Sequence, residues 1–266
     1  LGLINGSVSI RAASISYRIL LAFFPAMILL LSILPHTPLE TNDVMDALLL
    51  FFPGETVSLF ELTVNDLLEK SHISILSIGF VLTAFYASNS VNAILTGFNA
   101  SYLLEKKGNP MLYYFISLLL LVILVVMLGV AVFLIGFSGQ GLTWLSNKGL
   151  LPGELLPWLN IARWTMSLIL VYFSVSILYH FGNPDRDKWR TITPGATMTT
   201  ILIVLLSVGL GAFITYLDSY NRLYGSLGTF LLLLVWVNAN SSILLLGFEF
   251  NVSVHKARNE ARSNLQ

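Results

Sequence analysis

The sequence contains no cysteine and few charged residues. Without cysteine, the chain has no disulfide, no thiolate nucleophile and no thiolate metal ligand. Charged residues make up 11% of the 266 residues, well below the roughly 25% of an ordinary soluble domain. Fourteen basic and fourteen acidic residues give a net charge of zero, which leaves too few bases for a row of phosphate contacts. We therefore expect no nucleic-acid partner.

The residues that build metal and nucleotide sites are also scarce. Four histidines are scattered along the chain without the spacing of metal ligands, at His36, His72, His180 and His255. No glycine-rich phosphate loop with a following lysine occurs. We expect no metal ion, no cofactor and no catalytic residue, and so no enzyme activity. A membrane-embedded enzyme stays a third choice because no catalytic set converges.

Long apolar runs account for the composition, in which 56% of the residues are hydrophobic. Runs of about 20 apolar residues indicate membrane-spanning helices. Six are predicted, at 14–34, 73–99, 113–137, 161–181, 193–217 and 224–249. We predict an all-α integral membrane protein, a six-helix bundle forming one domain over residues 1–266.

The basic residues fix the orientation of the six spans. Lysine and arginine are more frequent in cytoplasmic loops than in outer loops. One side of the predicted bundle holds ten of them, Arg11, Arg18, Lys106, Lys107, Arg186, Lys188, Arg190, Lys256, Arg258 and Arg262. The other side holds four, Lys70, Lys148, Arg163 and Arg222. Both termini are therefore predicted in the cytoplasm. The first methionine is Met27, so we expect the numbered chain to lack its natural start.

The longest loop, residues 35–72, is acidic and lies on the outer side in this topology. Asp43 to Phe52 has the pattern of a short apolar helix, and Pro53-Gly54 ends it. A second helix beginning near Glu55 has its apolar residues at helical spacing. Both are too short to span a membrane. This extracytoplasmic helical hairpin either caps the bundle or lies in the outer-leaflet interface.

Polar side chains within the spans are candidates for function, because they cost free energy in hydrocarbon. Asn89, Asn92, Thr96 and Asn99 fall on one face of the second span. They form hydrogen bonds between helices or line a polar cavity. The sixth span carries Asn238, Ser242 and Glu249 on roughly one face.

Three other features concern the first and sixth spans. Gly225, Gly228 and Gly247 allow close packing of helices, and Pro25 can kink the first span. Arg18 lies near the cytoplasmic end of the first span. It reaches the headgroups, or it pairs with Glu249 or lines a cavity with it. We predict a polar cavity between spans one, two and six.

Five short motifs in order carry a resemblance to a known family. They are Phe24-Pro25, Phe98-Asn99-Ala100-Ser101-Tyr102, Trp189-Arg190 before Pro194-Gly195-Ala196, Tyr224-Gly225-Ser226-Leu227-Gly228 and Gly247-Phe248-Glu249-Phe250-Asn251. Together they resemble the YihY/virulence factor BrkB family of bacterial inner-membrane proteins. The resemblance implies six spans with both termini inside. Members are discussed as transporters and in connection with the envelope, serum resistance and lipopolysaccharide export.

Some members of that family carry an old label of ribonuclease BN, but this sequence lacks the clustered ligands of a metal-dependent nuclease. The sequence favours an inner-membrane transporter or a protein that handles lipids or envelope components. Its expected partners are membrane lipids and a lipid or small-molecule substrate, and a homo-oligomer stays open. The alternative is a non-transporting scaffold or assembly factor. A water-filled or lipid-filled cavity reaching Asn92 and Glu249 would separate the two.

Overall fold

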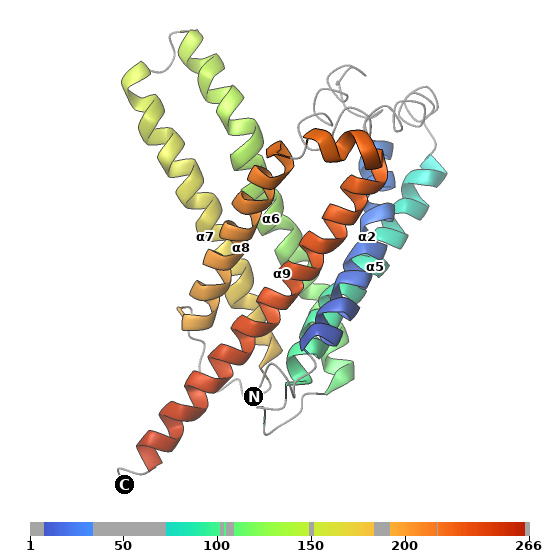
Figure 1. The fold of residues 1–266 in the computed structure, drawn as a ribbon, viewed down its shortest axis with the longest axis vertical. Coiled ribbons are helices and arrows are strands. Elements are labelled where there is room, and N and C mark those ends of the chain that lie inside the picture. The colour runs from blue at the N-terminus through green and yellow to red at the C-terminus, as the bar shows by residue number, and fades with distance from the viewer. Residues whose placement is uncertain are drawn as a thin grey trace. The chain divides into compact units, whose positions relative to one another are not determined.

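The computed structural model describes residues 8–33, 73–101, 104, 109–148, 152–183, 192–216 and 218–263. These residues form six long helices and no strand (Figure 1). The helices are α2 (Val8–Ile33), α5 (Ile73–Asn99), α6 (Pro110–Asn147), α7 (Leu156–Gly182), α8 (Pro194–Tyr216) and α9 (Asp218–Ser263). A short 3-10 helix, η2 (Gly153–Leu155), precedes α7. The short helices expected in residues 35–72 lie outside the described residues.

All six long helices have a stretch long and apolar enough to cross a membrane. The prediction of an all-α protein with six spans is therefore confirmed. Several helices extend beyond the predicted span: α6 continues to Asn147 and α9 runs from Asp218 to Ser263. Hydropathy marks only the segment in hydrocarbon, whereas a helix continues as long as its backbone bonds are made. At 1.5 Å per residue α6 is about 57 Å long, against roughly 30 Å of hydrocarbon.

Two helices begin with the same N-terminal capping arrangement. Proline is favoured in the first turn of a helix because its missing N–H would have no partner there. Asn109 precedes Pro110 and accepts the Met111 N–H on Oδ1 at 2.9 Å. Thr193 precedes Pro194, and its Oγ1 accepts the Ala196 N–H at 3.3 Å. The sequence thus sets the start of α6 and of α8 through a capping side chain followed by proline.

The chain divides into two compact units. Unit 1 contains Leu1–Val8, Ile94–Val204 and Ile243–Gln266, and unit 2 contains Ser9–Ala93 and Leu205–Ser242. Helices α5, α8 and α9 therefore each contribute residues to both units, whereas α6 and α7 belong to unit 1 alone. The prediction of a single membrane domain stays a prediction.

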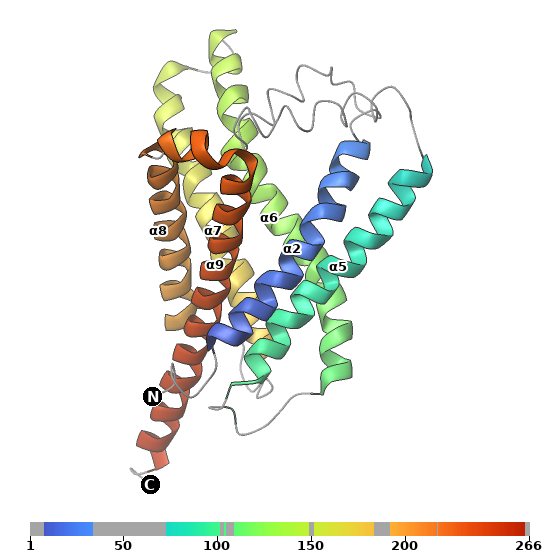
Figure 2. The ribbon, with the colours of Figure 1, turned by 45° about the vertical axis from the view of Figure 1, so that its right-hand side comes forward.

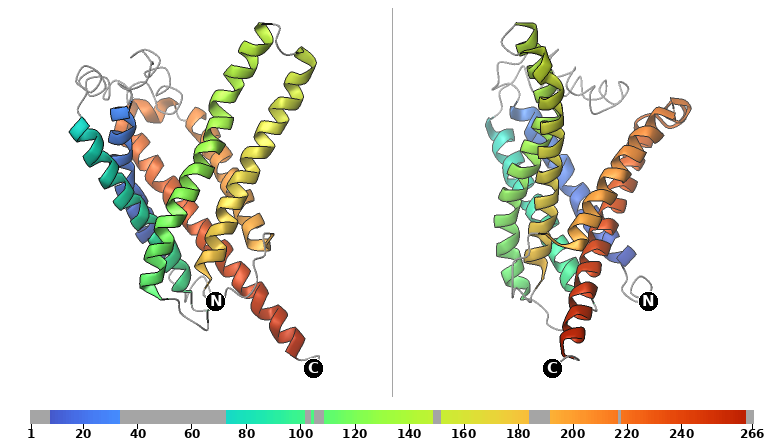
Figure 3. Two further views of the ribbon diagram at one scale, coloured as in Figure 1. Left: turned by 180° about the vertical axis from the view of Figure 1, so that it is seen from behind. Right: turned by 90° about the vertical axis from the view of Figure 1, so that its left-hand side faces the viewer.

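In unit 1, α6 and α7 run antiparallel and side by side (Figures 1 and 3). Serines on α7 bond across this contact: Ser167 Oγ donates to the Ala131 carbonyl at 3.3 Å, and Ser174 Oγ lies 4.0 Å from Met127 Sδ. At the far end the Tyr113 hydroxyl donates to the Gly182 carbonyl at 3.3 Å. Small and polar side chains allow the two backbones to approach closely, as is usual for helices packed in membranes.

In unit 2, α2 packs beside the first part of α5 (Figure 2). A Cβ atom at Gly79 would lie 3.7 Å from Leu29 Cα, so the two backbones are close there. Further along this contact the Ser90 hydroxyl donates to the Arg18 carbonyl at 2.8 Å. Pro25 lies inside α2, which continues through it to Ile33.

Candidate functional site

Three buried aromatic rings bring α5, α7 and α9 together in unit 1. Phe98 and Phe248 are stacked with ring centroids 4.4 Å apart and an interplanar angle of 12°. Tyr179 contacts both rings edge-on, at 5.4 Å from Phe98 and 5.8 Å from Phe248. Offset-stacked and edge-to-face pairs add about 0.5–1.5 kcal/mol beyond the area they bury. This trio therefore fixes the positions of the three helices here.

The Tyr179 hydroxyl adds α8 to this contact. It donates to the Leu244 carbonyl of α9 at 2.8 Å and lies 2.6 Å from the Thr199 hydroxyl of α8. A tyrosine hydroxyl can donate one hydrogen bond, and here it donates to the Leu244 carbonyl. In the other bond Thr199 is therefore the donor and the Tyr179 oxygen is the acceptor. We call Phe98, Tyr179, Thr199, Gly247 and Phe248 the Tyr179 junction.

Gly247 is at the junction because no side chain fits there. A Cβ atom at Gly247 would overlap Thr199 Oγ1 and Tyr179 Oη. Gly195 of α8 is equally enclosed, since its Cβ would overlap the Gly247 carbonyl oxygen and lie 2.6 Å from Asn251 Cγ. Helices α8 and α9 thus cross at a pair of glycines, with their backbones in direct contact.

The start of α8 is held by an amide from α9. Asn251 Oδ1 accepts the Gly195 N–H at 2.7 Å, and its Nδ2 donates to Thr193 Oγ1 at 2.9 Å. The Thr193 N–H in turn donates to the Tyr172 hydroxyl at 3.2 Å. We call Thr193, Gly195 and Asn251 the Asn251 clamp. It provides, from another helix, a partner for an N–H that the first turn of α8 leaves without one.

Glu249 lies on α9 between these two groups. Its side chain is 8% exposed, and it is the one charged residue that is buried among the described residues. It falls within the apolar segment Phe230–Arg258 of α9. An ionisable side chain at such a position is a functional candidate by default, because burial in an apolar span is costly.

The predicted residues of unit 2 contact one another in part. Asn238 Nδ2 of α9 donates to Ser16 Oγ of α2 at 3.1 Å, an interhelical bond between residues 222 positions apart. Ser242 Oγ donates to the Asn238 carbonyl of its own helix at 3.0 Å. The side chain of Arg18 is exposed, whereas Asn89 and Asn92 are half-buried on α5. Gly225 and Gly228 lie in α9, near its beginning.

The predicted cavity draws residues from both units. Asn99, Gly247 and Glu249 belong to unit 1, and Arg18, Asn89, Asn92, Asn238 and Ser242 belong to unit 2. The cavity and the pairing of Arg18 with Glu249 therefore stay predictions.

Sequence reasoning missed Tyr172, Tyr179, Thr193 and Thr199. Thr96 and Ser242 stood out in the sequence because they share a helix face with amides, whereas the predicted spans 161–181 and 193–217 contain no amide. A useful signal was present, since Tyr172 and Tyr179 are seven residues apart in α7 and so lie on one helix face. Within the described residues, no three His, Cys, Asp or Glu side chains gather in a way that could hold a metal ion.

Comparison with known proteins places the chain among membrane proteins. A profile of virulence factor BrkB matches residues 3–266. The ribonuclease-like protein YfkH of Bacillus subtilis is 27% identical over 93% of this chain and 90% of its own length. A UPF0761 membrane protein of Vibrio parahaemolyticus is 27% identical over 95% of this chain and 79% of its own length. No solved structure matches the chain.

Proposed function

The chain belongs to the virulence factor BrkB family, and from this premise we propose that it transports a substrate or handles lipids in the bacterial inner membrane. Glu249 is proposed to take part in that movement. Both termini are proposed to lie in the cytoplasm, in keeping with the excess of basic residues on that side.

The burial of Glu249 is the observation that carries this proposal. An apolar residue would serve structural packing alone at this position, whereas a buried carboxylate needs a partner that compensates its charge. Intramembrane acids are typical of ion and proton pathways and of substrate sites. A carboxylate also exchanges a proton, which an amide of the same shape cannot do. This difference allows function to be separated from packing.

We expect Glu249→Gln to abolish the proton entry or lipid movement that the wild-type protein supports, while leaving the fold intact. The purified chain is reconstituted in vesicles containing a pH-sensitive dye, and proton entry is driven by a potassium diffusion potential. A second set of vesicles contains a fluorescent phosphatidylethanolamine, whose movement between leaflets is followed by dithionite bleaching. Wild type should raise at least one of the two rates above that of protein-free vesicles.

Glu154→Gln is the matched control, because Glu154 is an exposed acid on η2 and the change is chemically the same. It should retain the wild-type rate. Equal rates for wild type, Glu154→Gln and a folded Glu249→Gln protein would contradict the role of Glu249. The absence of both activities in wild type would contradict the proposed function itself.

The scaffold alternative is favoured by the interhelical hydrogen bonds. Asn238 and Asn251, two of the amides in the spans, each bond to a residue of another helix, Ser16 of α2 and Gly195 of α8. Such bonds contribute roughly 0.6 kcal/mol on average in membrane proteins and need no water-filled path. An assembly factor with dry, closely packed helices would show the same contacts.

Cysteine accessibility separates the two candidates, because the natural chain has no cysteine to react. We expect Asn92→Cys and Ser242→Cys to react with a charged, membrane-impermeant thiol reagent if a polar cavity reaches them. Val81→Cys is the control, since Val81 is 64% exposed on an apolar part of α5 and faces hydrocarbon in the spanning topology. Reaction at neither Asn92→Cys nor Ser242→Cys, with both proteins folded, would favour the scaffold.

A further inference from the structure

Arg163 is a charged residue two turns into the apolar helix α7. Its side chain is half-buried, and its guanidinium carbon lies 5.8 Å from the centroid of the Trp164 ring. The Nε atom is buried and has no hydrogen-bond partner among the described residues. An arginine keeps its charge in every protein environment, so a counter-charge or a polar acceptor is needed near this position.

The depth of Arg163 indicates where that counter-charge is found. Helix α7 ends at Gly182, about 28 Å from Arg163 along the helix axis at 1.5 Å per residue. This distance is close to the roughly 30 Å thickness of the hydrocarbon layer. With Gly182 at one membrane face, Arg163 lies at the opposite face, at the level of the lipid headgroups. The predicted orientation makes this the outer leaflet.

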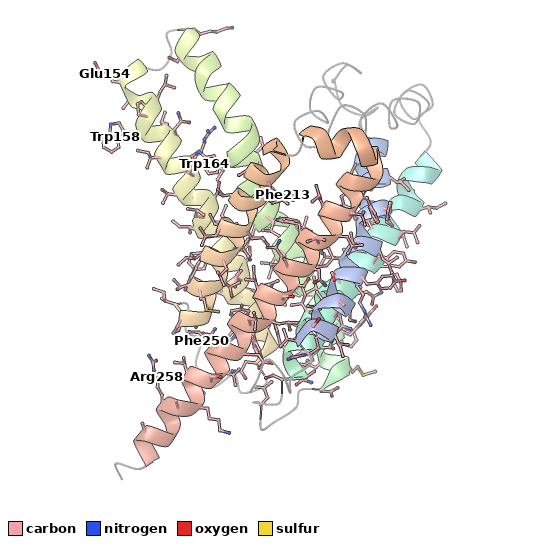
Figure 4. All side chains as sticks on the ribbon, viewed as in Figure 1. Glu154, Trp158, Trp164, Phe213, Phe250 and Arg258 are labelled. Carbon is pink, nitrogen blue, oxygen red and sulfur yellow. The ribbon has the colours of Figure 1, made fainter. Side chains whose placement is uncertain are left out.

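The side chains around Arg163 have the character of a membrane interface. Leu155, Trp158 and Ile161 are 46%, 70% and 58% exposed, and Trp164 is 51% exposed. Figure 4 shows Trp158 and Trp164 projecting from different sides of α7, near its beginning. Tryptophan is enriched at the level of the headgroups, where its ring is apolar and its N–H is hydrated. Exposed apolar side chains together with a cation fit a surface that contacts lipid at this level.

We propose that Arg163 and Trp164 bind the phosphate group of a phospholipid in the leaflet at this end of α7. A guanidinium donates two parallel N–H bonds to phosphate oxygens, which a single ammonium cannot do. The Trp164 ring below the guanidinium restricts its plane. The site requires neither transport nor Glu249, so it stands or fails separately from the proposed function.

Native mass spectrometry of the purified full chain tests this proposal. The protein is titrated with phosphatidylglycerol and, in parallel, with digalactosyldiacylglycerol, which has the same acyl chains and no phosphate. Wild type should retain one phosphatidylglycerol in preference to the galactolipid. Arg163→Gln should weaken this binding at least about tenfold, as expected for the loss of a charge-assisted pair of bonds.

Two further variants at the site and one control make the result interpretable. Arg163→Lys keeps the charge without the fork and should bind with intermediate affinity, as should Trp164→Phe, which keeps a smaller ring. Arg258→Gln makes the same charge change at an exposed position of α9 and should retain the phosphate-selective lipid. Unchanged binding in both Arg163 variants would overturn the proposal. Displacement of the lipid by inorganic phosphate would also overturn it, because the site would then take a free anion.

Discussion

Gly195→Ala is expected to destabilise the protein by roughly 3 kcal/mol, near the upper end for overpacking by one methyl group. The new Cβ would overlap the Gly247 carbonyl oxygen and crowd the Asn251 side chain. A backbone oxygen cannot rotate away, so α8 and α9 must separate or shift. The purified protein should show a melting temperature lowered by several degrees, measured by the loss of the monodisperse peak after heating.

Two glycines elsewhere in the helices provide matched controls. At Gly129 of α6 and Gly209 of α8, a Cβ atom would meet nothing within 4 Å among the described residues. Alanine is favoured over glycine by up to about 1 kcal/mol inside a helix, so both substitutions should maintain or raise the melting temperature. A Gly195→Ala protein as stable as these two would refute the close contact.

A rescue experiment distinguishes the atoms that obstruct a new Cβ at Gly247 from those that obstruct it at Gly195. The Cβ of a Gly247→Ala protein would overlap only side-chain oxygens at the shortest distances, those of Thr199 and Tyr179. Removing both oxygens by Thr199→Ala and Tyr179→Phe should recover part of the stability lost in Gly247→Ala. The same two changes should not rescue Gly195→Ala, whose obstacle is a backbone atom.

Asn251→Ala is expected to cost about 2 kcal/mol and to loosen the first turn of α8. The change removes the acceptor of the Gly195 N–H and the donor to Thr193 Oγ1, and a buried donor left without a partner costs about 1–3 kcal/mol. Hydrogen exchange followed by mass spectrometry should show faster exchange of a peptide covering residues 193–199. The melting temperature should fall at the same time.

Asn251→Asp and Asn240→Ala test whether this effect comes from the clamp. Asn251→Asp keeps an acceptor for Gly195 and should retain much of the protection. Among the described residues Asn240 Nδ2 donates within its own helix, to the Trp236 carbonyl at 2.8 Å, so Asn240→Ala should leave α8 unchanged. Faster exchange in α8 after Asn240→Ala, or none after Asn251→Ala, would mean that Asn251 does not hold the helix start.

The spans could be predicted because hydropathy is a local property of the chain. The predicted second span, 73–99, has the bounds of α5, and each other predicted span overlaps one long helix. The helix ends were less accurate, since α6 extends to Asn147 and α9 to Ser263. Beyond the hydrocarbon, helix length depends on capping and backbone bonds, which a hydropathy pattern does not record.

The candidate site was predictable only in its individual residues. The sequence singled out Gly247 and Glu249, and the motif Pro194-Gly195-Ala196, without indicating that Gly195 and Gly247 touch. The partners of Tyr179 lie 20 and 65 residues away, on α8 and α9. Contacts at such separations depend on how whole helices pack, and one sequence without aligned relatives carries no local signal of them.

The bonds around α8 also imply an order of assembly during synthesis. Thr199 can bond to Tyr179 of α7 as soon as α8 emerges, because both residues have by then been made. Asn251, the acceptor of the Gly195 N–H, is 56 residues further along the chain. At roughly 5–20 residues per second, translation needs several seconds to reach it. During that interval the start of α8 has no partner from α9, so a protein that stalls before Asn251 would expose this helix start to membrane quality control.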